Sequence, residues 1–273
     1  RDLVRSRGLG DVYKRQVMKC TFCFLFLTLH IALCFNQTVI RDSEPSGIWT
    51  LENSPYLIET NVGVAQWDSL YIEPGVEVIF QGYFEFLIKG CLVAIGTMNN
   101  PIVFTIDDTT GFNNINTTSG SWRGFVFDNE DALITTQSIL SHCDISFAKK
   151  IGNHHTLRKG GAIHVDYGGS VDITHNKIHH NVAGTGGAIY VQESTLITNN
   201  FIEYNFAYYS GGGIFVAGSD VTIINNVITY NRASLAGGGL IVGGSHNTIC
   251  CNNTIAHNFA EQGNGIYDTS HYP

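Results

Sequence analysis

The chain has little of what several protein classes require. Five of its 273 residues are proline, and charged residues make up 14% of the sequence. The seven cysteines follow no spacing typical of a disulfide framework or a zinc site. The repeated part has no run of helix formers long enough for a helix, and the apolar stretch 20–34 is too short to cross a bilayer with stable flanks. These absences argue against a helical fold, a disulfide scaffold and a helical membrane protein.

Two N-terminal segments stand apart from the rest of the chain. Residues 1–16 (RDLVRSRGLGDVYKRQ) resemble translated sequencing-adapter read-through, so we expect the native start at Met18. Residues 17–34 combine a short positive start with an apolar stretch, which predicts a secretory signal peptide. The segment also approaches a bacterial lipoprotein box, although Leu33 stands where a small residue is expected.

The charge balance changes when the first 34 residues are set aside. They carry six of the 15 basic and two of the 23 acidic side chains, which leaves 9 against 21. Such an acidic surface does not attract nucleic acid or anionic lipid. We therefore expect a secreted or cell-surface monomer with no nucleic-acid partner and, after signal removal, no membrane span.

A glycine-led motif dominates the second half of the sequence. Its five copies begin at Gly160, Gly186, Gly211, Gly237 and Gly263. A second motif, with two asparagines per repeat, runs in phase with the first. Its asparagines are Asn176, Asn200, Asn226 and Asn253 in one set, and Asn181, Asn205, Asn231 and Asn258 in the other. Self-similarity at a fixed period of about 25 residues is the signature of a stacked repeat.

Within each unit the apolar residues alternate with period two, as in Ile189 and Val191 on one side of Tyr190. A strand-only unit of this size buries its apolar side only by stacking on its neighbours. The sequence therefore predicts an all-β fold, a single-stranded right-handed parallel β-helix (solenoid) with coils of about 25 residues. The asparagines should form two structural columns at bends, and Cys143 should point inward in line with Asn176.

The first half lacks the glycine motif but alternates in the same way. We interpret 46–105 as irregular early coils that cap the solenoid and 107–122 as a long polar loop. Residues 47–268 then form one domain of roughly nine coils. The chain stops just after a new coil opens, so we expect a domain truncated at the C-terminus.

These motifs resemble known repeats. The glycine and asparagine motifs are similar to the GGA(I/L/V) and FxxN repeats of polymorphic outer-membrane proteins, with isoleucine in place of phenylalanine at Ile178, Ile202, Ile228 and Ile255. The stretch from Gly47 to Tyr267 resembles secreted right-handed parallel β-helix proteins of the pectin-lyase-like superfamily. The resemblance implies a fold that hosts lyases, hydrolases, adhesins and passive scaffolds.

One basic segment interrupts the repeat and is a candidate ligand-binding loop. Its basic and histidine residues are Lys149, Lys150, His154, His155, Arg158 and Lys159. A basic cluster on an acidic protein could hold an anionic sugar, although a solvated insertion has the same composition.

Two further sets of residues have both structural and functional interpretations. An outward column of Tyr190, Phe215 and Tyr267, with His164 and Ile241 in line, could stack on sugar rings or pack across strands. His164, His175, His179 and His180, with Glu203 beside His179, could bind a metal, but their spacing matches no ligand pattern. We expect no metal site there and treat these histidines as surface residues.

No column of the repeat stacks two acidic residues on neighbouring coils, as hydrolysis or elimination would require. We therefore predict no catalytic residues and no cofactor. The leading hypothesis is a non-catalytic adhesive or glycan-contacting scaffold whose partner is an extracellular polysaccharide or cell-surface glycan. The alternative is a polysaccharide lyase or glycoside hydrolase, acting on an anionic polysaccharide beside 149–159 and Asp107-Asp108. Calcium is expected only under that alternative.

Overall fold

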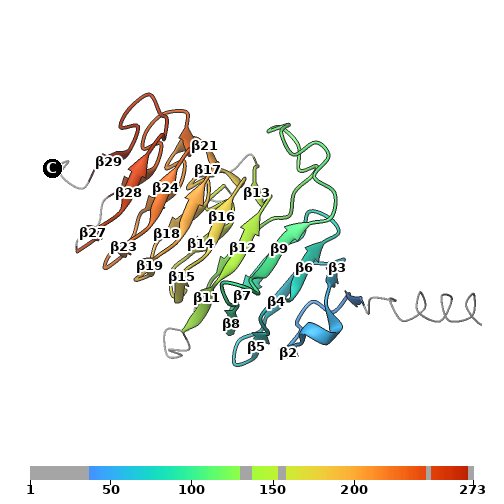
Figure 1. Ribbon diagram of the computed structural model, residues 1–273. Helices are drawn as coiled ribbons and strands as arrows, with labels where there is room; N and C mark the ends of the chain where they lie inside the picture. Colours follow the sequence, from blue (N-terminus) through green and yellow to red (C-terminus); the bar gives the residue numbers. More distant parts are fainter. Residues whose placement is uncertain (1–36, 130–136, 153–157, 244–246, 270–273) are drawn as a thin grey trace, which may run out of the picture. The chain divides into compact units, whose positions relative to one another are not determined.

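Short parallel strands, stacked in register, make up the described part of the chain (Figure 1). The computed structural model describes residues 37–129, 137–152, 158–243 and 247–269, which all belong to one unit that starts at Gln37. The adapter-like segment and the predicted signal peptide lie outside these residues. No helix among the described residues is long and apolar enough to cross a membrane.

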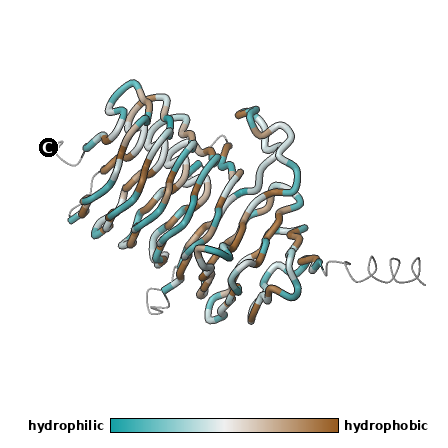
Figure 2. Tube along the Cα trace, in the orientation of Figure 1, coloured by the Kyte–Doolittle hydropathy of each residue, from teal (hydrophilic) through white to brown (hydrophobic). Residues whose placement is uncertain are grey.

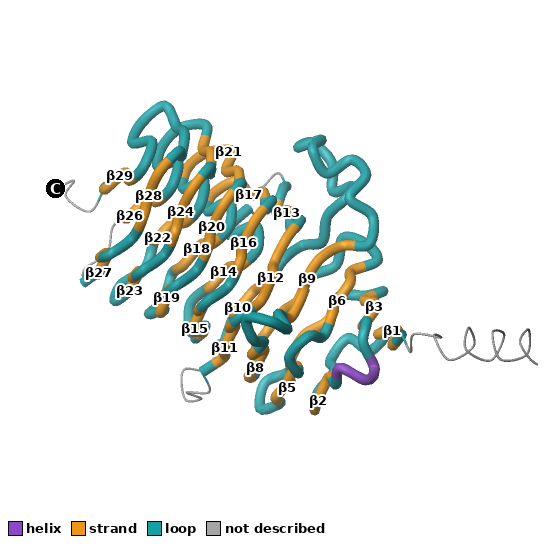
Figure 3. The backbone as a smooth tube through the Cα atoms, viewed as in Figure 1, coloured by secondary structure: helices purple, strands orange, loops and turns teal. Residues whose placement is uncertain are grey.

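The strands form three long sheets and one small sheet, all parallel (Figure 3). Sheet 1 contains β1 (Thr38–Ile40), β3 (Tyr56–Ile58), β6 (Glu77–Phe80), β9 (Ile102–Ile106), β12 (Cys143–Ser146), β16 (Lys177–His179), β20 (Phe201–Glu203), β24 (Val227–Thr229) and β28 (Thr254–Ala256). Sheet 2 contains β2 (Gly47–Trp49), β5 (Ser69–Ile72), β8 (Cys91–Ile95), β11 (Ser138–Ser141), β15 (Val171–Thr174), β19 (Leu196–Thr198), β23 (Thr222–Ile224) and β27 (Ile249–Cys251).

Sheet 3 contains β4 (Val62–Val64), β7 (Phe86–Ile88), β10 (Phe125–Phe127), β14 (Ile163–Val165), β18 (Ile189–Val191), β22 (Ile214–Val216), β26 (Leu240–Val242) and β29 (Ile266–Asp268). The small sheet contains β13 (Lys149–Lys150), β17 (Val182–Thr185), β21 (Phe206–Ser210) and β25 (Arg232–Ala233). A short 3-10 helix, η1, spans Leu51–Asn53. Each coil visits sheets 3, 2 and 1 in turn, so the predicted all-β parallel β-helix is confirmed.

Equivalent residues of successive coils lie directly above one another. In sheet 3, Ile163 pairs with Ile189, and Ile189 with Ile214. The same holds in sheet 1, where Ile178, Ile202 and Ile228 follow each other in register and are fully buried. Hydropathy accordingly alternates along the coils (Figure 2), with the apolar positions turned toward the shared interior.

The structure corrects three details of the sequence interpretation. The first strand begins at Thr38, before the expected domain start at residue 47, and pairs with β3. The early coils share the three-sheet register of the later ones instead of capping them irregularly. Third, the structure has a fourth, small sheet, which the sequence interpretation did not include and on which Ala207 and Ala233 pack as a separate buried cluster.

The glycine pair that opens each later coil has two distinct physical roles. Gly186 has a φ of 65°, a left-handed conformation that glycine adopts without penalty. A Cβ on Gly187 would lie 2.2 Å from the carbonyl oxygen of Gly212 in the next coil. Close stacking of the coils at this corner therefore requires glycine.

The two sets of asparagines lie in continuous buried columns. Asn181 shows the pattern, since its backbone N–H and its side-chain amide both donate to Oδ1 of Asn205 at 3.0 Å. The Asn205 amide in turn donates to the carbonyl of Ile178. The backbone N–H of Cys143, which is buried as predicted, donates to Asn176 Oδ1 at 2.8 Å. Each coil thus satisfies the buried polar groups of the next.

Candidate functional site

The long loop between β9 and β10, here called the 107–121 loop, wraps around one buried ammonium group. Lys149 Nζ donates to four carbonyl oxygens of this loop: Phe112 (2.7 Å), Asn114 (3.2 Å), Thr117 (3.1 Å) and Ser119 (3.3 Å). It also lies 4.8 Å from the centre of the Phe112 ring. The side chain is 0% exposed, and burial lowers the pKa of Lys149 below its ordinary value.

Lys150, the next residue of β13, points the other way and is also buried. Its Nζ donates to the carbonyl of Phe125 at 3.1 Å. Burial lowers the pKa of Lys150 to about 8, against the opposing effect of Glu85. Both placements differ from the ligand-binding loop that the sequence predicted and from its alternative, a solvated insertion. Neither ammonium is accessible to a ligand, because strand alternation turns one toward the 107–121 loop and the other toward sheet 3.

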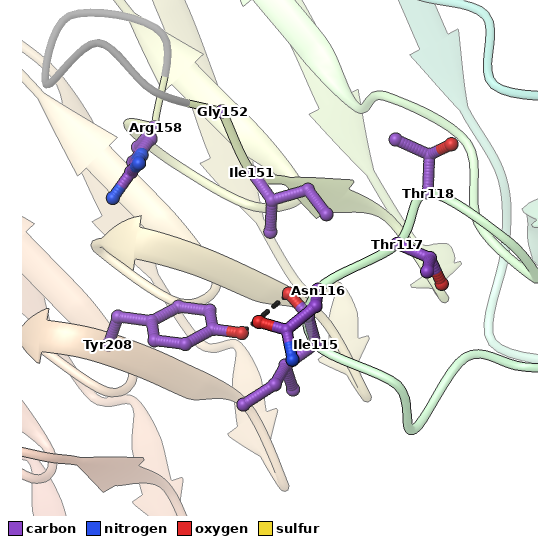
Figure 4. Close-up of a pocket in the computed structure, with 8 residues that line it drawn as sticks. All are labelled: Ile115, Asn116, Thr117, Thr118, Ile151, Gly152, Arg158 and Tyr208. Atoms are coloured by element: carbon purple, nitrogen blue, oxygen red, sulfur yellow. Dashed lines mark hydrogen bonds between the residues drawn. The ribbon is translucent and has the colours of Figure 1, made fainter.

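A cavity of about 510 Å³ lies between the 107–121 loop and the small sheet (Figure 4). Its lining residues are Ile115, Asn116, Thr117, Thr118, Ile151, Gly152, Arg158 and Tyr208. In Figure 4, Arg158 and Tyr208 stand on one side and the 115–118 segment faces them. One cation, one aromatic ring and several polar groups therefore surround the same space, and no carboxylate is among the described lining residues.

Two hydrogen bonds fix the small-sheet side of this cavity. The Tyr208 hydroxyl donates to the carbonyl of Ile115 at 2.6 Å, which ties β21 to the 107–121 loop. Arg158 Nη1 donates to the Tyr209 hydroxyl at 3.0 Å. A guanidinium has five N–H donors, and the described residues offer Arg158 Nε no partner. The guanidinium thus lies at the wall of the cavity, with its buried Nε unpartnered among the described residues.

A smaller cavity of about 300 Å³ adjoins the same loop. Asp107 and Asp108 line it together with Tyr83 and Ser121, and Thr118 lines both cavities. The Thr110 backbone N–H donates to Asp108 Oδ1 at 2.8 Å, and hydrogen bonding to Thr110 lowers the pKa of Asp108. The carboxylates and Arg158 therefore line different cavities, instead of facing each other across one substrate.

The remaining sequence-predicted site residues lie elsewhere. His154 and His155 fall outside the described residues. Lys159 donates to Gln192 Oε1 and lies 4.7 Å from the centre of the Tyr190 ring. Tyr190 is only 7% exposed and stacks on Phe215 at 5.3 Å. This column, which continues to Tyr267, stands in register as expected, but Tyr190 is covered by its neighbours.

An exposed ring ladder runs one residue before the second asparagine column and before Ala148, whose N–H donates to the first asparagine of that column. Its rings are Phe147, His180, Tyr204, Tyr230 and His257, stacked at centroid distances between 5.0 and 5.6 Å. Tyr204 and Tyr230 are each 49% exposed. Sequence reasoning missed this ladder, although its signal was present: a ring precedes the asparagine in every copy of the second motif.

The histidines beside this ladder are engaged with each other and with one carboxylate. His179 Nε2 lies 2.8 Å from Asp144 Oδ1, and His179 Nδ1 lies 2.7 Å from His180 Nδ1. His164 is buried at another place, on sheet 3, where burial and the charges of Lys150 and Lys159 lower its pKa. Among the described residues, no group of three or more His, Cys, Asp or Glu is placed to hold a metal ion.

Comparison with known proteins bears on the fold. Residues 161–271 match the family model described as right handed beta helix region. This match agrees with the stacked parallel sheets and gives the β-helix its right-handed sense. No curated protein and no solved structure matches the chain. The later coils of the chain therefore resemble the repeats of right-handed β-helices.

Proposed function

We propose that this protein is a non-catalytic, glycan-contacting scaffold that binds an acidic extracellular or cell-surface polysaccharide in the cavity beside the 107–121 loop. The carrying observation is the composition of that cavity. Arg158 can pair with a carboxylate or sulfate group, Tyr208 offers an aromatic surface to a sugar ring, and Asn116 and Thr117 offer hydrogen bonds to hydroxyls.

The acidic and basic groups line different cavities, which supports binding without catalysis. Glycoside hydrolysis uses two carboxyl groups on opposite sides of the scissile bond, and none is among the described residues lining the larger cavity. Asp107 and Asp108 are sequence neighbours in the smaller cavity, where no described lining residue is basic. A lyase or hydrolase remains an outcome that the test below can reveal.

The proposed location is secreted or at the cell surface. It follows from the signal-peptide pattern of 17–34 and from the resemblance of the repeats to those of polymorphic outer-membrane proteins and secreted pectin-lyase-like proteins. A glycan partner and an acidic overall charge are consistent with that location. On a surface that otherwise repels anions, a local basic group restricts the binding of an acidic glycan to one place.

Binding to a panel of neutral, uronate-containing and sulfated oligosaccharides tests this function. We expect selective binding of an acidic member and its loss in Arg158→Ala and Tyr208→Ala. Arg41→Ala removes an exposed arginine that pairs with Glu59 at 2.8 Å and serves as the charge-matched control. The same samples are followed for new reducing ends or unsaturated sugars. Release of such products would show that the protein is an enzyme and not a non-catalytic scaffold. Unchanged binding in both cavity variants would show that the glycan does not bind in this cavity.

A further inference from the structure

The small sheet carries an outward row of side chains whose exposure changes along the solenoid. Strand pairing aligns the members of this outward row, which are Lys149, Val182, Phe206, Arg232 and Phe259. An alanine of the small buried cluster follows Phe206, Arg232 and Phe259, so strand alternation turns these three side chains outward. Lys149 and Val182 are buried, Phe206 is half-buried, and Arg232 and Phe259 are exposed. The row therefore becomes accessible over the late coils.

The accessible part of the row is continuous with the wall of the larger cavity. Tyr208, which lines that cavity, follows Phe206 by two residues on β21, and the two ring centroids lie 5.2 Å apart. Phe206 pairs with Arg232 on β25. The Arg232 guanidinium in turn lies 5.4 Å from the centre of the Phe259 ring. Each of these side chains thus adjoins the next, from the cavity to the last described coil.

The charges along the row favour an acidic ligand. Among the described residues, no carboxylate forms an ion pair with Arg232. The strands of the small sheet contain no acidic residue, and the first acid after the row is Glu261, two residues beyond Phe259. A guanidinium stacked on an aromatic ring still presents its N–H edge to a carboxylate or sulfate group. The row can therefore attract an anionic group on a chain that is acidic overall.

We propose that Phe206, Arg232 and Phe259 form a second subsite for the acidic glycan, so that one polysaccharide chain runs from the cavity along the solenoid axis. Arg158 and Arg232 each bind an anionic group of that chain, and the two phenylalanine rings pack against sugar faces. From β13, which is followed by the cavity residues Ile151 and Gly152, to Phe259 the row crosses four coil spacings, or about 19 Å. The ligand is accordingly a polymer and not a single sugar.

This inference rests on the proposed function for the class of ligand, and it adds that binding depends on chain length. A short acidic sugar occupies the cavity alone, whereas a longer one also reaches Arg232. The carboxylate of a uronate and a sulfate ester present the same oxygen chemistry to a guanidinium, so the test uses probes of both kinds.

The first test compares a galacturonate disaccharide with the octasaccharide, and sulfated galactose oligosaccharides of the same two lengths, by isothermal titration calorimetry. For the kind of acidic sugar that binds, the octasaccharide should bind at least about tenfold more tightly than the disaccharide. Equal affinities at the two lengths would overturn the second subsite while the glycan function stands. Binding of neither length would refute the glycan function and the subsite with it.

The second test assigns the gain in affinity to the row. Arg232→Ala and Phe259→Ala should each weaken octasaccharide binding about tenfold and leave disaccharide binding unchanged. Phe201→Ala removes a ring of sheet 1 that is 56% exposed, as Phe259 is, and Arg41→Ala removes an exposed arginine; these matched controls should change neither affinity. A gain with chain length that survives both row substitutions would show that the longer sugar binds elsewhere, which would overturn the proposal.

Discussion

The early and late coils share one backbone path but bury different side chains. Sheets 1 and 3 of the early coils pack large rings, with Phe80 stacked on Trp122 at 4.3 Å and Phe125 edge-on to Phe104 at 4.9 Å. The late coils bury isoleucine in register, together with the asparagine columns, and only these coils match the family model. The difference shows that strict repetition is needed for a motif to be visible in sequence, but not for coils to stack.

The two regions meet at β13, and the candidate site lies there. The coil that contains Phe125 ends in Lys149 and Lys150, and the next coil opens with the first glycine pair. The 107–121 loop leaves the early coils and is tied by Tyr208 to a late one. The cavity thus depends on both regions, and the following substitutions probe how each contributes.

Phe125→Ala should have the largest effect on stability. The ring is fully buried and contacts four other aromatic rings, so its removal leaves a cavity in the early core. We expect the free energy of unfolding to fall by about 3–5 kcal/mol, measured by urea denaturation. Phe201→Ala, at a ring that is 56% exposed in a late coil, is the matched control and should change it by less than about 0.5 kcal/mol.

Asn205→Ala tests whether the asparagine columns stabilise the late coils. It leaves the buried N–H of Asn181 and the carbonyl of Ile178 without their partner, which should cost about 1–3 kcal/mol for each group that water cannot reach. Asn225→Gly, at a left-handed φ of 59° on the other bend, should be nearly neutral. Equal effects of the two substitutions in thermal unfolding would show that the columns add nothing beyond bend geometry.

The pH dependence of the free energy of unfolding tests whether Lys150, at the junction of the early and late coils, is shielded from water. The pKa of Lys150 is about 8 in the folded chain against an ordinary 10.5, so the unfolded chain binds more protons between these values. The free energy of unfolding should therefore rise with pH across this window, by roughly 1–3 kcal/mol. Lys150→Met should lack this increment, which is read from the difference between the two unfolding curves at pH 7 and pH 10. A difference that is flat with pH would place Lys150 in contact with water.

Tyr230→Ala should give the smallest change. Its ring is half exposed and stacks on Tyr204 at 5.1 Å and on His257 at 5.0 Å. Loss of these contacts should lower the free energy of unfolding by about 0.5–1.5 kcal/mol. A loss as large as that of Phe125→Ala would mean that the surface ladder, rather than the aliphatic interior, holds the late coils together.

The sequence predicted the repeated coils and the asparagine columns, but it missed the ring ladder, which also repeats, and the contacts of the loops that do not repeat. The period of the glycine motif led to the parallel coils, and the spacing of Asn176 and Asn200 led to the hydrogen-bonded columns. The burial of Lys149 could not be predicted, because its four acceptors lie more than 29 residues away in a loop that has no counterpart in the other coils. The exposure of Tyr190 was overestimated for a similar reason, since Lys159 lies over its ring from outside the strand pattern.

The central claim is that the cavity at the junction binds an acidic glycan without cleaving it. Co-crystallisation with the acidic oligosaccharide that binds most tightly is the direct measurement. The account predicts an intact sugar in the cavity, with its anionic group beside Arg158. A sugar bound only at another surface, or a cleaved product beside Asp107 and Asp108, would contradict it.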